Sequence, residues 1–185
     1  MKLDAPRAQA TLSLFRMDVS NEQTFDPITL RSTSGGASRR KGVELEATLQ
    51  PTDFASLATD WTLNDARYLA FVTAAADTLA GAPIFNTAKY IGSVSLDLAP
   101  PGAAWSLRLA GNVVGPYTPF DEPGVTLRAY GLLHLSGGVV VRGARLELGL
   151  RNLLDRRYPE LRAGGFVSPG QPRALYLTLS RRAPR

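Results

Sequence analysis

The 185-residue sequence contains no cysteine and a single histidine, His134. Without cysteine, neither a disulfide framework nor a thiolate metal site is possible. One histidine cannot form a metal cluster by itself, so we expect His134 to be a neutral residue within a strand. No nucleophile–base pair and no phosphate-binding loop is recognisable either. We therefore predict neither an enzyme nor a bound cofactor.

Long hydrophobic runs are also missing. No stretch approaches the roughly 20 apolar residues of a membrane-spanning helix. The first residues, MKLDAPRAQA, contain a lysine but no apolar run behind it, so we expect no signal peptide in this chain. These absences do not make the protein soluble, because a closed barrel also spans a bilayer, using short alternating strands.

Positive charge is in excess but is not concentrated. The formal net charge is +5 and the isoelectric point is near 9.9. A nucleic-acid-binding protein would gather this charge on one surface. Here the basic residues are spread along the chain, with small groups at 39–41, 156–157 and 181–182. We expect no nucleic-acid partner.

The pattern that recurs is an alternation of apolar and polar residues with a period of two. In the segment GVELEATLQ, Val43 and Leu45 fall on one face, and Glu44 and Glu46 fall on the other. The segments IGSVSLDLA, WSLRLAGNV and RLELGLRN repeat this alternation. Such alternation is typical of two-faced strands. It predicts eight strands, at residues 8–19, 40–50, 55–69, 85–98, 104–115, 127–141, 145–154 and 172–181.

Short and long connections alternate along the predicted strands. The short ones are residues 51–54, 99–103 and 142–144, and the long ones are residues 20–39, 70–84, 116–126 and 155–171. An antiparallel up-and-down sheet whose two ends face different surroundings gives this pattern, as outer-membrane barrels do with short periplasmic turns and longer external loops. We therefore expect an all-β fold, an antiparallel up-and-down sheet of about eight strands, of which a transmembrane barrel segment with external long connections is one form.

Alternation alone does not tell the inside of a barrel from its outside, since a soluble carrier places its apolar face inward and a membrane barrel places it outward. The predicted polar face contains Glu44, Glu46, Asp60, Asn64, Asp97, Arg108, Asn112, Arg145, Glu147 and Arg151. Aromatic residues gather near the strand ends beside the long loops: Tyr68, Phe71, Phe85, Tyr90, Tyr117, Phe120, Tyr130 and Tyr158. We expect a girdle at the membrane interface, because amphipathic rings favour the headgroup level. The alternative is that these rings pack over the loops.

Four segments, in order, resemble the barrel of TonB-dependent outer-membrane receptors. They are SRRKGVELEATLQP (38–51), WTLNDARYLAF with APIFNTAKY (61–71 and 82–90), GLRNLLDRRYPE (149–160) and SPGQPRALYLTLS (168–180). The resemblance singles out Gly42, Glu44, Glu46, Asn86, Asn152, Asp155, Tyr158, Pro169, Gly170 and Arg173. We expect these residues to have a structural role, with Asn152 and Asp155 hydrogen-bonded to the backbone where strand pairing ends and Tyr158 at the membrane interface.

The resemblance implies an active uptake receptor for a scarce nutrient, such as an iron–siderophore complex, in the bacterial outer membrane. Such receptors have a barrel of about 22 strands closed by a plug. Residues 1–185 would then be the C-terminal portion of the barrel, with the plug and the earlier strands absent, and with a last strand that ends LSRRAPR instead of in an aromatic residue. The implied partners are outer-membrane lipid, the rest of the barrel and its plug, a TonB-type energy-coupling protein acting through that plug, and a small nutrient ligand.

Variable loops on a fixed scaffold carry recognition, so residues 70–84, 116–126 and 155–171 are the candidate ligand contacts. The alternative is a self-contained eight-stranded barrel, either a small outer-membrane protein or a soluble carrier of a small ligand. A self-contained barrel would pair residues 8–19 with residues 172–181, whereas a portion of a larger barrel would leave both edges open.

Overall fold

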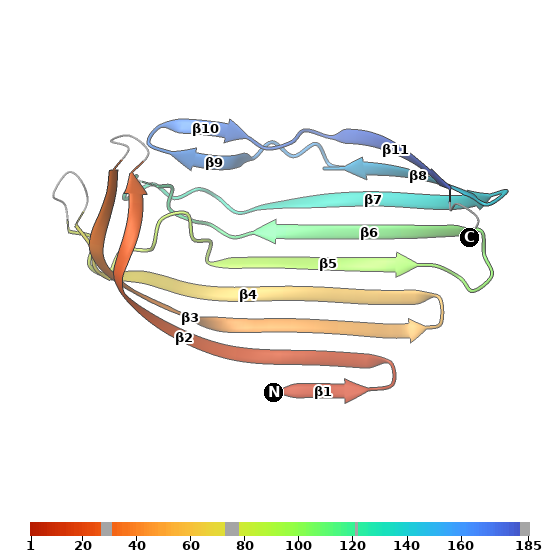
Figure 1. Cartoon of the computed structure of the whole chain (residues 1–185), viewed down its shortest axis with the longest axis horizontal. Coiled ribbons are helices and arrows are strands. Elements are labelled where there is room, and N and C mark those ends of the chain that lie inside the picture. Colours follow the sequence, from red (N-terminus) through yellow and green to blue (C-terminus); the bar gives the residue numbers. More distant parts are fainter. Residues whose placement is uncertain (27–30, 73–77, 121, 182–185) are drawn as a thin grey trace.

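The computed structural model describes residues 1–26, 31–72, 78–120 and 122–181, which form strands and turns (Figure 1). In this described part, no helix is long and apolar enough to cross a membrane. The strands are β1 (Lys2–Ala5), β2 (Ala8–Asp26), β3 (Arg31–Thr52), β4 (Ala55–Ala70), β5 (Tyr90–Leu98), β6 (Trp105–Val114), β7 (Tyr130–Val141), β8 (Ala144–Arg151), β9 (Pro159–Ala163), β10 (Phe166–Pro169) and β11 (Ala174–Arg181).

Nine of these strands form one antiparallel sheet in the order β1-β2-β3-β4-β5-β6-β7-β8-β11. The hairpin β9–β10 forms a separate two-stranded sheet beside it. Figure 1 shows a single curved sheet whose edge strands, β1 and β11, lie at opposite sides. Within the described residues, neither edge strand pairs with the other, so the alternative of a self-contained eight-stranded barrel is wrong. The sheet is an incomplete part of a larger barrel.

All eight predicted strands are present, and the sequence pattern missed β1, β9 and β10. The prediction of an irregular connection at residues 155–171 is therefore wrong over the hairpin β9–β10. The prediction of a long irregular connection at residues 20–39 is wrong, because β2 continues to Asp26 and β3 begins at Arg31; residues 27–30 lie outside the described part. These strand ends have no apolar face, so they lack the alternation that a half-buried strand shows. Their backbone pairing continues nevertheless, with irregularities in register near Glu22.

The pairing registers bring one leucine from each of seven strands, β3 to β8 and β11, into a single row across the sheet. The row consists of Leu49, Leu57, Leu96, Leu109, Leu135, Leu150 and Leu175. Leu49, Leu109 and Leu175 are 43%, 38% and 66% exposed. Burial of one leucine is worth about 1.5–3 kcal/mol, so exposing this row to water would forfeit on the order of 10 kcal/mol. A soluble domain has about 5–15 kcal/mol of net stability, so this face requires hydrocarbon or a partner.

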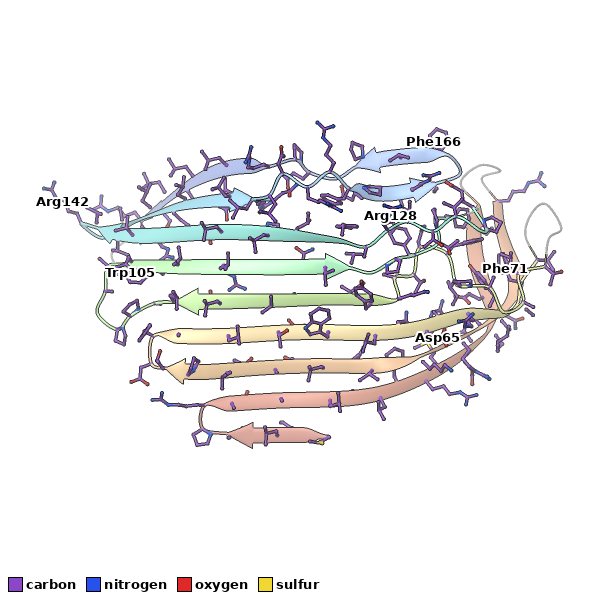
Figure 2. All side chains as sticks on the ribbon, turned by 180° about the vertical axis from the view of Figure 1, so that it is seen from behind. Asp65, Phe71, Trp105, Arg128, Arg142 and Phe166 are labelled. Atoms are coloured by element: carbon purple, nitrogen blue, oxygen red, sulfur yellow. The ribbon has the colours of Figure 1, made fainter. Side chains whose placement is uncertain are left out.

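The same registers place the ten predicted polar residues together on the opposite face. Asp97 lies opposite Arg108, which donates to both of its carboxylate oxygens at 3.0 Å. Arg145 lies 3.5 Å from Glu147. Figure 2 shows the sheet from behind, with Trp105 near the short-turn end of the strands and Asp65 towards the long-loop end.

Aromatic rings lie directly over several glycines. The Phe15 ring covers Gly42, its partner across β2 and β3, and the Trp61 ring covers Gly92 across β4 and β5. The Tyr176 ring covers Gly149 in the same way. A methyl group added at Gly42 would lie 2.0 Å from the Leu63 carbonyl oxygen and 2.7 Å from the Phe15 ring. The absence of a side chain therefore permits close ring packing where the sheet curves.

We expect Gly42→Ala to lower stability by about 1–3 kcal/mol, because the added methyl group meets backbone and must separate two strands. The matched control is Gly111→Ala, where the nearest atom lies 3.7 Å away and the contact is ordinary. Thermal unfolding of a complete barrel containing these strands measures the difference. Equal midpoints for the two variants would contradict the close packing at Gly42.

Candidate functional site

The long loops form a packed cluster at one end of the sheet. Their buried core contains Ala66, Tyr68, Phe71, Leu79, Ile84 and Phe85, with Ala82 and Phe120 packed against it. The Tyr68 ring lies 4.7 Å from Phe71, and the Phe85 ring lies 5.7 Å from Phe120. Tyr68 is only 3% exposed. The predicted membrane girdle is therefore wrong for these rings, which pack over the loops as in the alternative.

Hydrogen bonds from Asn86, a residue of the family motif, join the segment before β5 to one of the predicted ligand-contact loops, residues 116–126. Asn86 has a positive φ of 53° and donates its backbone N–H to the Thr118 carbonyl at 2.8 Å. Its side-chain Oδ1 accepts from the Phe120 N–H at 3.2 Å. Asn86 thus ties the segment before β5 to the connection between β6 and β7.

The third predicted loop joins the cluster through a bidentate ion pair. Arg162, in β9, donates to both carboxylate oxygens of Glu122 at 2.8–3.1 Å. The Gly165 N–H donates to the same carboxylate at 3.2 Å, and the Gly164 N–H donates to the Phe120 carbonyl. The hydrogen bond from Arg162 holds the pKa of the Glu122 carboxyl below its ordinary value, although burial opposes this shift. The three loops therefore form one connected surface.

The polar segment that follows the leucines of β8 begins with the buried residue Asn152. Its side chain is 2% exposed and every polar atom is used. Nδ2 donates to the carbonyls of Arg156 and Gln171 at 2.9 and 3.0 Å, and Oδ1 accepts from the Arg156 N–H at 2.8 Å. Its φ of 48° is one that asparagine tolerates better than most residues. Asn152 therefore fastens the turn after β8 to the segment that enters β11.

The neighbouring motif residues contact the same junction. Asp155, also at positive φ, accepts from the Arg173 N–H at 3.0 Å. The Tyr158 ring stacks on Tyr130 at 4.6 Å and covers Gly170, where an added methyl group would lie 2.1 Å from the ring. Tyr130 is four residues from His134 on β7 and therefore lies on the same polar face, so the expectation that Tyr158 lies at the membrane interface is wrong. Pro169 ends β10 opposite Pro159 in an irregular register.

His134 lies in β7 beside this junction. Its Nδ1 accepts from the Asn152 N–H at 3.3 Å, and its Nε2 lies 3.0 Å from Asn112 Oδ1. An accepting Nδ1 carries no proton, so the network assigns a neutral ring that donates from Nε2. Among the described residues, no group of three or more histidine or acidic side chains is placed to hold a metal ion.

Two hollows on the polar face share an arginine. Arg108 lines both, together with Asp97, Arg145 and Glu147 in one and His134 and Arg151 in the other. Arg145 also donates to the Ser106 hydroxyl at 2.8 Å, and the Arg151 guanidinium lies 5.4 Å from the centre of the Tyr176 ring. This part of the face presents fixed cations. They alternate with carboxylates, so the charge is partly compensated.

Glu44 and Glu46, which the family resemblance singles out, lie on the same polar face, on β3. Glu46 lies directly opposite Asp60 of β4, and Glu44 lies opposite Thr62. Asp60 accepts a hydrogen bond from the Ser93 hydroxyl at 3.0 Å. Like charges directly opposite one another destabilise a strand pair. These three residues form an acidic strip, because the register places no basic residue directly opposite any of them.

An open antiparallel sheet with an apolar outer face, a charged inner face, short turns at one end and packed loops at the other defines the wall of a large transmembrane barrel. Residues 1–153 match the family model of the TonB dependent receptor-like β-barrel. The chain belongs to this family of receptor and transport proteins, whose members are proteins of the bacterial outer membrane. A search of curated protein sequences gives no match.

Solved structures share the fold at low sequence identity. The siderophore receptor PiuA from Acinetobacter baumannii is 16% identical, with a TM-score of 0.75 over 94% of this chain and 26% of its own. The ferric yersiniabactin uptake receptor FyuA from Yersinia pestis is 20% identical, with a TM-score of 0.75 over 94% and 27%. The copper transporter OprC is 17% identical, with a TM-score of 0.74 over 96% and 29%. This chain thus spans about a quarter of the length of these receptors.

Sequence reasoning did not find Glu122 or Arg162. Forty residues separate them, and neither belongs to a recognisable motif. The only signal was that both lie in long connections predicted at the same end of the sheet. This signal places the two residues at the same end of the sheet but does not identify them as an ion pair.

We expect Asn152→Ala to destabilise the junction by at least about 2 kcal/mol, because one N–H and two carbonyls lose their partner and each orphaned group costs about 1–3 kcal/mol. Glycine adopts a positive φ readily, so Asn152→Gly removes the side-chain hydrogen bonds without straining the backbone. Faster proteolysis between residues 153 and 173 in both variants measures the loss. Protection of the glycine variant equal to the parent would show that only φ matters.

The Glu122–Arg162 contact should depend on pH in one direction. Folding lowers the pKa of Glu122. The contact therefore stabilises the loops fully when the pH is above the ordinary carboxyl pKa, and this stabilisation is lost as the pH falls through the lowered pKa of the folded state. Hydrogen exchange at the Gly165 amide, corrected for the intrinsic rate, should stay slow from pH 8 to 5 and rise below that. Glu122→Gln should exchange faster and show no such rise. An identical acid profile in that variant would assign the effect elsewhere.

Proposed function

We propose that this chain is the C-terminal portion of the barrel of an outer-membrane receptor that takes up a scarce nutrient, such as an iron–siderophore complex, by TonB-dependent transport. The observation that carries the proposal is the division of the sheet into a leucine-bearing outer face and a charged inner face with two open edges. In this role the outer face contacts lipid, and the edges pair with the remaining strands. The inner face lines the lumen.

The loop cluster supports a role in ligand capture. Three loops from separate parts of the chain are held together by the aromatic core and by the Glu122–Arg162 pair. Such a scaffold fixes the loop backbone and leaves exposed side chains free to vary. Preorganisation of this kind favours tight binding, because the loops lose less conformational freedom when the ligand binds.

The acidic strip supports contact with a plug inside the barrel. Glu44, Glu46 and Asp60 face the lumen on adjacent strands, where water-filled space or a second domain must supply the compensating charge. A plug with cationic side chains against this strip would be attracted to it. An inner-membrane partner of the TonB type would then act on the plug, and the barrel wall would remain fixed.

Uptake of radioactive iron, supplied separately as citrate, catecholate and hydroxamate complexes, tests the proposal in cells that carry the complete receptor and no other iron receptor. We expect one class of complex to enter, and entry to stop when the TonB-type partner is removed. Replacing residues 159–169 by a glycine–serine linker should weaken binding about tenfold or more, whereas shortening residues 100–103 at the other end should not. Uptake that persists without the energy-coupling partner would refute the proposal.

A further inference from the structure

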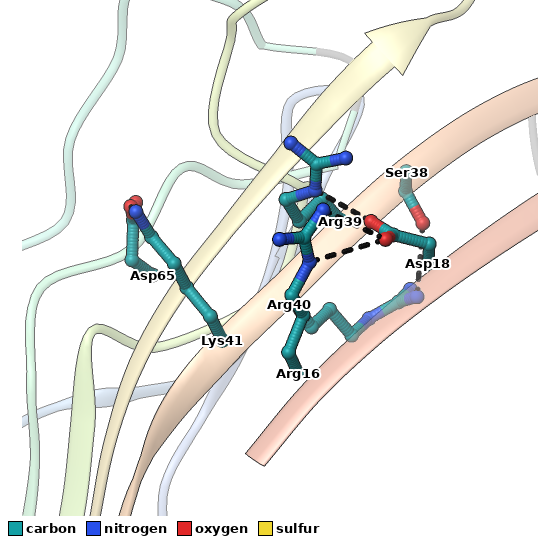
Figure 3. Close-up of polar contacts among 7 residues, drawn as sticks. All are labelled: Arg16, Asp18, Ser38, Arg39, Arg40, Lys41 and Asp65. Atoms are coloured by element: carbon teal, nitrogen blue, oxygen red, sulfur yellow. Dashed lines mark hydrogen bonds and ion pairs between the residues drawn. The ribbon is translucent and has the colours of Figure 1, made fainter. Parts of the chain in front are cut away.

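Two rows of charged side chains cross the outer face just beyond its apolar part. Along β2, β3 and β4, the last apolar row is Leu14, Val43 and Leu63. The next row in register is Arg16, Lys41 and Asp65, and the row after it is Asp18, Arg39 and Arg67. All six residues of these two rows are charged, and we call them the charged rows. Figure 3 shows five of the six, namely Arg16, Asp18, Arg39, Lys41 and Asp65.

The charged rows lie on the outer face, because the register is unbroken from Ala8 to Ser20 on β2 and the side-chain period is two. Leu14 is 79% exposed and Leu63 is 53% exposed, so this is the face that meets hydrocarbon. Rows two residues apart are separated by about 7 Å along a strand. The first charged row is therefore about 7 Å beyond hydrocarbon-facing leucines, at the long-loop end of the sheet.

The charges within the rows compensate each other only in part. Asp18 accepts from Arg39 at 2.5 Å and lies 3.1 Å from Arg16. Asp65 lies 2.9 Å from Arg67 and 3.5 Å from Lys41. Two carboxylates thus serve four cations, whose side chains remain 39–60% exposed.

The register also places like charges side by side. Arg16 is directly opposite Lys41, and Arg39 is directly opposite Arg67. Like charges directly opposite one another destabilise a strand pair, and the two carboxylates leave a net charge of +2 on the six residues, four cations against two anions. Arginine and lysine bind phosphate oxygens through strong charge-assisted hydrogen bonds, and the planar guanidinium matches phosphate in a bidentate geometry.

We propose that the charged rows bind the phosphate groups of a lipid of the outer leaflet, whose acyl chains lie along the apolar rows of β2–β4. The inference rests on the proposed placement of the barrel in the membrane and concerns a surface separate from the lumen and the ligand loops. Continuity of the two surfaces identifies the occupant, because only a molecule with both acyl chains and phosphates covers hydrocarbon-facing leucines and exposed cations together. A free phosphate would use the cations alone.

Binding of lipid A with two phosphates to the purified complete receptor in detergent, followed by native mass spectrometry, tests this inference. The parent should bind this lipid about tenfold more tightly than its dephosphorylated form, since each surface cation contributes about 1 kcal/mol, a factor of about five, towards an anionic headgroup. Arg39→Gln with Lys41→Gln should lose at least fivefold of this affinity. The conservative pair, Arg39→Lys with Lys41→Arg, should retain it within twofold.

The matched control is Arg142→Gln with Arg181→Gln, which removes the same charge at the short-turn end and should leave affinity within twofold. Equal losses in the control and test variants would overturn the proposal, as would equal affinity for the two lipids. Displacement by inorganic phosphate as effective as displacement by the lipid would also overturn it, because it would show a site for a free anion. If Arg39→Gln with Lys41→Gln fails to fold, the affinities of the parent protein for the two lipids still test the proposal.

Iron uptake by the same variants separates this inference from the proposed function. Normal uptake with weakened lipid binding is the expected result for Arg39→Gln with Lys41→Gln. Failure of the parent to take up iron, with lipid preference intact, would refute the transport proposal and leave the lipid site standing.

Discussion

The pairing register between neighbouring strands is the constraint on which the rest of the structure depends. Hydrocarbon offers no hydrogen-bond partners, so each backbone group within it must be satisfied by the next strand. Because the side-chain period is two, a shift of one residue would exchange every leucine of the row with a polar neighbour. The row from Leu49 to Leu175 crosses seven strands, and a shift in any one pair would interrupt it. The apolar exterior and the charged lumen are therefore two consequences of a single set of pairings.

Two kinds of packing operate at different levels of the molecule. In the sheet, rings lie flat over glycines, as Phe15 does over Gly42, and cross-strand contacts replace a central core. At the long-loop end, Tyr68 and Phe85 pack into a small buried cluster of the kind found in soluble domains. The difference follows from the solvent, because hydrophobic burial drives packing only where water surrounds the chain. The loops thus carry their own core above the membrane-facing wall.

Much of the sheet could be predicted from the sequence, because alternation reports which face each residue of a half-apolar strand occupies. The eight strands and the ten polar-face residues follow from it, and so does the hydrogen-bonded role of Asn152 and Asp155 at a strand end. The prediction failed where that signal is absent. The outer parts of β2 and β3 have no apolar alternation in their sequence, so the sequence predicts a loop there. The sequence also predicts a girdle that includes Tyr68 and Phe71, because aromatic residues near strand ends suit an interface and a loop core equally well.

The sequence by itself determined the fold class, the two faces of the sheet and the family, since each depends on local periodicity or on short motifs. Only the tertiary structure decided that, among the described residues, β1 and β11 do not pair with each other, that Arg162 contacts Glu122, and that Arg16, Arg39 and Lys41 share the outer face with the leucines. These features depend on which residues of distant segments lie opposite one another. That is a property of register and chain path, and no residue carries it alone.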